Sequence, residues 1–179
     1  MVYLGNYASP VGDIVLGSDG ENLIGLWFKD QKYFLDSIKE DTVQKDDLNI
    51  FNETSKWLDK YFSGEKPLIS DLPISPRGSD FRKSIWKILC EIPYGKVITY
   101  NDIAKEIANQ KGIEHMSAQA VGGAVSHNPI SIIIPCHRVV GSKGSLTGYA
   151  GGIDKKIKLL EHEKVDMSNL FIPRKGTAL

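Results

Sequence analysis

The sequence has few of the residues that build metal sites or disulfide networks. Its 179 residues include only two cysteines, Cys90 and Cys136, and four histidines. The cysteines lie far apart in the sequence, with no CxxC pair and no clustered histidines, so the pattern predicts neither a structural zinc site nor a disulfide framework. We therefore expect a protein that needs no metal and no other cofactor. Its cysteine content is typical of a reducing compartment.

Long apolar segments are also missing. No stretch approaches the ~20 apolar residues that a membrane-spanning helix requires. The first residues lack the basic region and the apolar region of a signal peptide. The sequence therefore predicts a cytoplasmic protein that does not associate with a membrane. Its length fits one large domain or two small ones.

An excess of charge of either sign is absent overall, but the charges are unevenly distributed. Residues 1–79 contain 8 Lys and Arg against 13 Asp and Glu, which gives −5. Residues 80–165 contain 12 against 8, which gives +4, and residues 166–179 contribute +1. An anionic partner would therefore bind the second block and not the first.

The first block has the pattern of a small sheet covered by a helix. Runs of strand-forming residues over 3–7, 13–16 and 23–28, separated by turns, predict an antiparallel meander. Asn52 is the predicted N-cap of a helix that ends at Gly64. Residues 29–49 follow no clear period. Nothing in this block suggests catalysis.

A segment rich in proline and glycine, residues 66–78, predicts a domain boundary. We expect an α/β (α+β) protein of two small domains, residues 1–75 and 76–179. From Ser79 the apolar spacing predicts a helix, which ends before a Pro-Tyr-Gly stop. Cys90 lies in this helix without a neighbouring histidine or arginine, so we assign it a structural role.

Two short helices are predicted next. Thr99 is a suitable N-cap, and Asp102, three residues later, completes a capping box for a helix that runs to about Ala108. Ser117 begins a second helix, residues 118–127. Two short helices joined by a loop predict a helix-turn-helix.

The second of these helices is poor in bulky side chains. Adjacent glycines at Gly122 and Gly123 each destabilise a helix by roughly 1 kcal/mol relative to alanine. This cost suggests that another backbone, either DNA or a neighbouring helix, approaches the helix closely.

We expect Cys136 to be the reactive residue of this protein. It lies in the segment Pro135 to Val139, after the apolar run 130–134. A thiolate is the strong nucleophile, and His137 and Arg138 offer a proton acceptor and a positive charge beside it. The alternative is that Cys136 is a small buried residue at the end of a core strand.

A final helix follows the glycine- and serine-rich loop 141–152. Three lysines, Lys155, Lys156 and Lys158, are predicted to face outward as solvated charges or phosphate contacts. Glu163 ends this helix. Apart from Glu161, it is the nearest downstream carboxylate that can orient His137.

These segments together resemble the O6-alkylguanine-DNA alkyltransferase family, also called methylated-DNA-protein-cysteine methyltransferases. The resemblance covers residues 80 to about 165. Its motifs are Tyr94-Gly95-Lys96-Val97, Thr99-Tyr100, Ala120-Val121-Gly122-Gly123-Ala124, Asn128-Pro129, Ile134-Pro135-Cys136-His137-Arg138-Val139, Gly148-Tyr149 and Leu159-Leu160. The N-terminal half is similar, more loosely, to the family's ribonuclease-H-like scaffolding domain. The resemblance implies a mostly helical second domain of winged helix-turn-helix type.

The resemblance implies a specific chemistry for Cys136. This residue would take a methyl or other alkyl group from O6 of guanine in DNA and keep it, so each molecule would act once. His137 would relay the thiol proton through a water, and Glu163 would orient the imidazole. Asn128 matches a hinge residue, and Tyr100 matches a tyrosine that donates toward the base as charge develops on it.

The resemblance also implies how DNA is bound. The damaged nucleotide must leave the duplex, and loop 141–152, which includes Tyr149, would form one wall of its pocket. The carbonyls of Cys136 and Val139 and the amide of Ala150 match groups that bind the base. The second helix would enter the minor groove. Its predicted DNA-binding residues are Gln119, Ala120, Gly122 and Gly123.

Gln119 departs from the family pattern, because many members have an arginine there that fills the gap left by the extruded base. A glutamine lacks the positive charge, so we expect base flipping to persist with weaker DNA affinity. The expected partner is double-stranded DNA that contains O6-alkylguanine, bound by a monomer.

Two other classes of function remain open at this point. A cysteine hydrolase would use Cys136 and His137 as a dyad. A binding module, either a winged helix-turn-helix regulator or an alkyltransferase-like lesion binder, would need no reactive cysteine.

Overall fold

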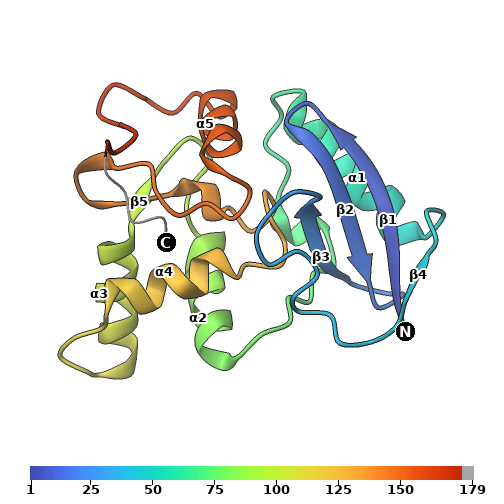
Figure 1. Cartoon of the computed structure of the whole chain (residues 1–179), viewed down its shortest axis with the longest axis horizontal. Helices are drawn as coiled ribbons and strands as arrows, with labels where there is room; N and C mark the ends of the chain where they lie inside the picture. The colour runs from blue at the N-terminus through green and yellow to red at the C-terminus, as the bar shows by residue number, and fades with distance from the viewer. Residues whose placement is uncertain (175–179) are drawn as a thin grey trace.

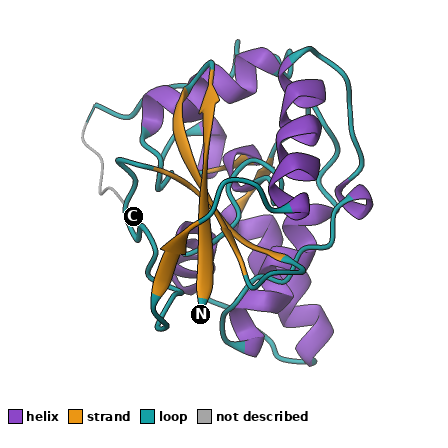
Figure 2. Ribbon diagram, turned by 90° about the vertical axis from the view of Figure 1, so that its right-hand side faces the viewer, coloured by secondary structure: helices purple, strands orange, loops and turns teal. Residues whose placement is uncertain are grey.

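A computed structural model describes residues 1–174 and shows two domains side by side, a sheet domain and a helical domain (Figure 1). The last residues of the predicted second domain, 175–179, lie outside the described residues. Viewed from the sheet side, the strands lie in front of the helical domain (Figure 2). Within residues 1–174, no helix combines the length and the apolar character needed to span a membrane.

The sheet of the first domain has four strands in the order β3-β2-β1-β4. The strands are β1 (Val2–Ser9), β2 (Gly12–Ser18), β3 (Leu23–Phe28) and β4 (Thr42–Gln44). The predicted antiparallel meander is confirmed, because β1 pairs with β2 and β2 with β3 in antiparallel register. Strand β4 pairs in parallel with β1. The sequence did not predict it, because its three residues are exposed and lie in a charged segment.

Helix α1 (Asn49–Phe62) covers one face of this sheet (Figure 1). The predicted N-cap at Asn52 is wrong, since the cap is Leu48, which makes no side-chain cap bond. The helix begins earlier because Ile50 and Phe51 are apolar and their burial stabilises an additional turn.

Within residues 76–174, the second domain contains four α-helices, α2 (Asp80–Cys90), α3 (Tyr100–Lys111), α4 (Ala118–Ser126) and α5 (Ile153–His162). Two short strands, β5 (Ile98–Thr99) and β6 (Val139–Val140), pair in parallel. Single 3-10 turns occur at η2 (Cys136–Arg138) and η3 (Ser142–Gly144) in this domain, and at η1 (Ile69–Asp71) near the end of the first domain. Helices α3 and α4 pack together as the predicted helix-turn-helix.

The predicted starts of α3 and α4 are confirmed. Thr99 and Asp102 form a reciprocal capping box, with the Asp102 amide bonded to Thr99 Oγ1 at 3.1 Å. The Ser117 hydroxyl accepts from the Ala120 amide at 3.3 Å. Helix α3 continues past the predicted end at Ala108 to Lys111. It ends there because Gly112 adopts a left-handed conformation that suits a helix C-terminus.

The apolar run 130–134 is buried, but it forms turns rather than a core strand. It lies along the edge of β3 in the other domain, where the Leu26 amide donates to Pro129 O at 2.8 Å and the Ser131 amide donates to Leu26 O at 3.0 Å. Ile132 has a φ of 69°, which is unusual for a β-branched residue. The sheet domain therefore holds the segment that leads into Cys136.

Buried side chains of both domains form one continuous apolar cluster, which extends from Ile14 in β2 to Leu159 in α5. Because protein interiors are closely packed, such a shared core restricts motion of one domain against the other.

Candidate active site

Cys136 lies at the start of η2, with 5% of its surface exposed. The Asn128 amide nitrogen donates to its sulfur at 3.1 Å and to Ile134 O at 2.8 Å. The Asn128 carbonyl oxygen in turn accepts from the Ile130 amide at 3.0 Å. Asn128 follows α4, so one side chain joins the end of that helix to the turn that presents the thiol.

Burial raises the pKa of the Cys136 thiol, because the thiolate is less well solvated there. The Asn128 hydrogen bond, the charge of Lys156 and nearby backbone amides oppose this shift without reversing it. The resting thiol is therefore protonated, and a nucleophilic reaction requires a group that accepts its proton.

His137 and Glu163 form a fully buried pair, with 2.6 Å between Nε2 and Oε1. Burial lowers the pKa of His137, although Glu163 acts in the opposite direction. The carboxylate fixes the hydrogen on Nε2, which leaves Nδ1 as an acceptor. No described residue is hydrogen-bonded to Nδ1, which is buried. The neutral imidazole thus has a free lone pair and an oriented ring.

Glu163 is held by several further donors. Arg138 donates from Nε to Oε2 at 2.8 Å and from Nη2 to Oε1 at 2.9 Å. The Gly95 amide contacts Oε2 at 3.2 Å, and the Tyr61 hydroxyl donates to Oε1 at 2.8 Å. Burial acts to raise the pKa of Glu163, but the hydrogen bonds and charges of His137 and Arg138 hold it well below its usual range. Glu163 is therefore ionised at neutral pH.

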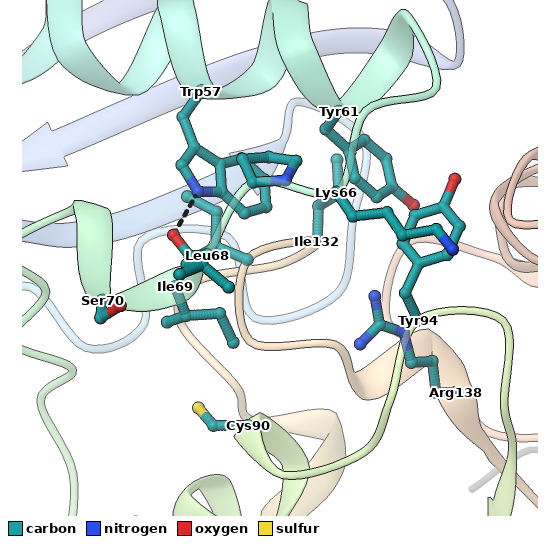
Figure 3. Close-up of a pocket in the computed structure, with 12 residues that line it drawn as sticks. Trp57, Tyr61, Lys66, Leu68, Ile69, Ser70, Cys90, Tyr94, Ile132 and Arg138 are labelled. Carbon is teal, nitrogen blue, oxygen red and sulfur yellow. Dashed lines mark hydrogen bonds between the residues drawn. The ribbon is translucent and has the colours of Figure 1, made fainter.

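Tyr61 belongs to the sheet domain, in which the sequence indicated no site residue. It lines a cavity of about 360 Å³ between the domains, together with Tyr94 and Arg138 (Figure 3). No sequence pattern predicts the contact between Tyr61 and Glu163, because these residues lie 102 positions apart.

Lys156 corrects one prediction, since this lysine is fully buried and does not face outward. Its Nζ donates to the carbonyls of Val139 and Thr147. Desolvation lowers the pKa of Lys156 to about 8. A signal was present in the sequence: Lys156 lies three and four residues before Leu159 and Leu160, on the apolar stripe of α5. Lys155 instead pairs with Asp30 at 2.8 Å.

Two of the predicted base-binding residues, Tyr100 and Tyr149, lie near Cys136. The Tyr100 hydroxyl donates to Thr147 O at 3.1 Å and has a raised pKa because of burial and of Cys136. Tyr149 is 7% exposed, and its hydroxyl lies near Ser131 without a hydrogen bond of good geometry to any residue within 1–174. Ala150 O accepts from the Lys32 amide at 3.0 Å. Val139 O already accepts from Lys156, so only its second lone pair is free.

Helix α4 separates its predicted DNA-binding residues into two groups. Gln119, Ala120 and Gly123 are exposed, and a Cβ added at Gly123 meets no described atom within 4 Å. Internal packing therefore does not explain this glycine. Gly122, the fourth predicted DNA-binding residue, is buried and so does not share the exposed side of the helix with the other three. It lies with the buried Val121 and Val125 on the side of α4 that packs against α2 and α3.

Comparison with known families gives matches over both domains. Residues 80–165 match the family described as 6-O-methylguanine DNA methyltransferase, DNA binding domain. Residues 2–76 match the ribonuclease-like domain of the same methyltransferases.

Individual relatives agree with these matches. A methylated-DNA-protein-cysteine methyltransferase of Haemophilus influenzae is 40% identical over 92% of this chain and 87% of its own length. One from Methanosarcina acetivorans is 42% identical over 90% of this chain and 98% of its own. A crystal structure from Mycobacterium tuberculosis, in complex with DNA, superposes with a TM-score of 0.77 at 38% identity, covering 90% of this chain and 92% of that one.

Proposed function

The chain belongs to the 6-O-methylguanine DNA methyltransferase family, which repairs DNA by direct alkyl transfer to a protein cysteine, and we propose that its accepting cysteine is Cys136. The observation that carries this proposal is the arrangement of Cys136 beside Asn128 and the His137–Glu163 pair. The substrate is O6-alkylguanine in double-stranded DNA. The protein is a cytoplasmic monomer whose domains divide at residues 75 and 76.

The proposed reaction is a displacement at the alkyl carbon. The Cys136 sulfur forms a bond to that carbon while the bond from the carbon to guanine O6 breaks. The thiol proton passes through a water to His137 Nδ1, and Glu163 stabilises the imidazolium that results. The bonding electrons remain with guanine, and Tyr100 donates a hydrogen bond toward the base as this charge develops. The thioether is stable, so each molecule reacts once.

The extruded base occupies the space between Cys136 and loop 141–152. The Ala150 amide donates to O6, and the carbonyls of Cys136 and Val139 accept from the exocyclic amine. Ala150 N–H is suited to this role because no hydrogen bond joins it to another described residue. Tyr149 forms part of the wall, and its buried hydroxyl offers a further polar contact.

Helix α4 binds the minor groove through Gln119, Ala120 and Gly123. The open space over Gly123 supports this role, because it permits a phosphate backbone or sugar to approach the helix closely. The net positive charge of residues 80–165 adds a general attraction to DNA. Gln119 occupies the space that the flipped base vacates.

The test is to incubate the protein with DNA that carries a labelled methyl group at guanine O6, and to locate the label by peptide mass analysis. One methyl group on Cys136 for each molecule of protein is the expected result. Label on Cys90, or on no residue, would overturn the proposal. Repeated turnover of a model ester would instead support the hydrolase alternative.

A further inference from the structure

The sheet domain supplies one of the groups that hold Glu163. The Tyr61 hydroxyl, from α1, donates to Glu163 Oε1 at 2.8 Å. This is the oxygen that also contacts His137 Nε2 at 2.6 Å. Within residues 1–174, the other donors to Glu163 all belong to the helical domain. Tyr61 therefore connects the first domain directly to the oxygen that orients the histidine.

The position of Tyr61 is fixed at both ends. The residue is 1% exposed, and its ring stacks on Trp57 with 5.8 Å between centroids. Its backbone carbonyl contacts His162 Nε2 at 2.7 Å. The ring of Tyr94 meets it edge-on at 6.1 Å, and both rings lie close to Arg138 (Figure 3). A tyrosine held in this way has little freedom to release the carboxylate.

We propose that Tyr61 is a positioning residue for alkyl transfer, whose hydroxyl fixes the Glu163 carboxylate and through it the ring of His137. The sheet domain is then a part of the reactive assembly and not only a scaffold. This inference rests on the proposed roles of Cys136, His137 and Glu163.

The hydrogen bond also sets how strongly Glu163 acts on the imidazole. By donating to Oε1, Tyr61 takes up part of the negative charge that faces His137, so it limits the tendency of Glu163 to raise the pKa of His137. Burial, and then the charge of Glu163, raises the pKa of Tyr61, so its hydroxyl stays protonated and remains a donor. The charged and titratable groups around this pair are Cys136, Arg138, Lys156, Tyr94, Tyr149 and His162, whose ring packs against that of Tyr61.

Removing the hydroxyl therefore changes the pH dependence of the reaction in a defined direction. His137 accepts a proton only when it is neutral, so the rate falls as the pH decreases through its pKa. Without Tyr61 the carboxylate interacts more strongly with the imidazolium, and the pKa of His137 rises. The acidic limb of the rate profile then moves to higher pH. A residue that only stabilises the fold would leave that limb in place.

The experiment compares Tyr61→Phe with the wild type in single-turnover methyl transfer, from about pH 8 to below about pH 5, because burial lowers the pKa of His137 from the value at which histidines ordinarily titrate. We expect a rate at neutral pH that is lower by about tenfold, the scale of one hydrogen bond to a charged group, because the loss of positioning of Glu163 and the His137 ring outweighs the stronger interaction with the imidazolium. We also expect the acidic limb to move to higher pH. The phenylalanine ring keeps the contact with Trp57, so the variant retains the packing.

Tyr7→Phe is the matched control. Tyr7, in β1, also donates to a carboxylate at 2.8 Å, that of Asp59 in α1, the helix that carries Tyr61. This bond is at the surface. The rate and the acidic limb of this variant should equal those of the wild type. An equal loss in both variants would show a general effect of the sheet domain and would overturn the inference.

A double variant separates action through Glu163 from an independent effect. In a Glu163→Gln background, Tyr61→Phe should cost less than it costs alone, because its partner is already altered. The same fold-loss in both backgrounds, or a wild-type profile for Tyr61→Phe, would overturn the role of Tyr61. If the wild type itself places no methyl on Cys136, the proposed function fails instead.

Discussion

The two cysteines occupy regions that differ in the partners they provide. Cys90 ends α2 and lines the cavity between the domains, where it is half-buried. Burial raises its pKa, the neighbouring Glu91 adds to the shift, and Arg138 opposes it. Cys136 is more deeply buried, and its pKa is also raised. Burial by itself therefore does not distinguish Cys136, the proposed reactive thiol, from Cys90.

The difference lies in the polar groups around each sulfur. Cys136 has a hydrogen bond from Asn128, the nearby charge of Lys156 and an adjacent histidine with a free nitrogen. Within residues 1–174, the Cys90 sulfur accepts no side-chain hydrogen bond, and no histidine lines the cavity beside it. A buried thiol becomes useful when its site stabilises the thiolate during the reaction and accepts its proton, even though the resting group is neutral.

The largest expected effect is at the two sulfurs themselves. Cys136→Ser should abolish methyl transfer, because a serine hydroxyl is a far weaker nucleophile, while DNA binding persists. Cys90→Ser should transfer at the wild-type rate. Labelled-methyl transfer and a DNA mobility-shift assay measure the two properties. Loss of transfer in Cys90→Ser together with full transfer in Cys136→Ser would reverse the assignment.

Glu163→Gln should have the next largest effect. An amide stabilises the imidazolium of His137 poorly, so we expect a transfer rate about 100-fold lower. The buried Arg138 also loses its counter-charge, which should reduce the free energy of unfolding by about 3–5 kcal/mol. Urea unfolding and single-turnover kinetics measure these losses. Glu161→Gln, an exposed change two residues away, is the control and should leave both unchanged.

The wild type and the Glu163→Gln variant also test how the free energy of unfolding depends on pH. Folding lowers the pKa of Glu163 from its ordinary value of 4.5. The carboxylate thus contributes stability that is present above about pH 4.5 and is lost as the pH falls below it. The difference in unfolding free energy between wild type and Glu163→Gln should therefore shrink on acidification. A constant difference would contradict the ionised state of Glu163.

Asn128→Ala should be less severe. It removes the donor to the Cys136 sulfur and the hydrogen bonds of Asn128 to the Ile134 carbonyl and the Ile130 amide, which shape the turn before Cys136. We expect a transfer rate about 10- to 30-fold lower, since a hydrogen bond to a developing thiolate is charge-assisted. Asn109→Ala, at an exposed site in α3, is the matched control. Equal rates for the two variants would exclude Asn128 from the activation of the thiol.

The smallest effect is expected at Gln119, away from the reacting atoms. Gln119→Ala should weaken DNA binding by a few-fold and reduce the transfer rate to a similar degree, because one polar contact in the groove is lost. Gln44→Ala, on the exposed strand β4, should bind DNA as the wild type does. Unchanged binding and transfer in Gln119→Ala would show that this residue does not fill the space left by the base.

The sequence by itself determined what depends on near neighbours in the chain. The meander, the capping box at Thr99, the helix-turn-helix and the reactive segment at Cys136 all follow from spacings of a few residues. Local backbone preferences and side-chain periods operate over such distances. The local residues at Cys136 indicated a reactive thiol but also allowed a buried structural cysteine or a hydrolase dyad, so the expectation of alkyl transfer came from the resemblance to the alkyltransferase family.

Only the tertiary structure decided which charged and polar groups are buried. Lys156 was predicted to be solvated, yet the packing of α5 buries it, and its Nζ donates to the carbonyls of Val139 and Thr147. Tyr61 reaches Glu163 from the other domain, at a sequence separation of 102 positions. Burial and long-range hydrogen bonds depend on how whole elements pack, and no local pattern encodes that packing.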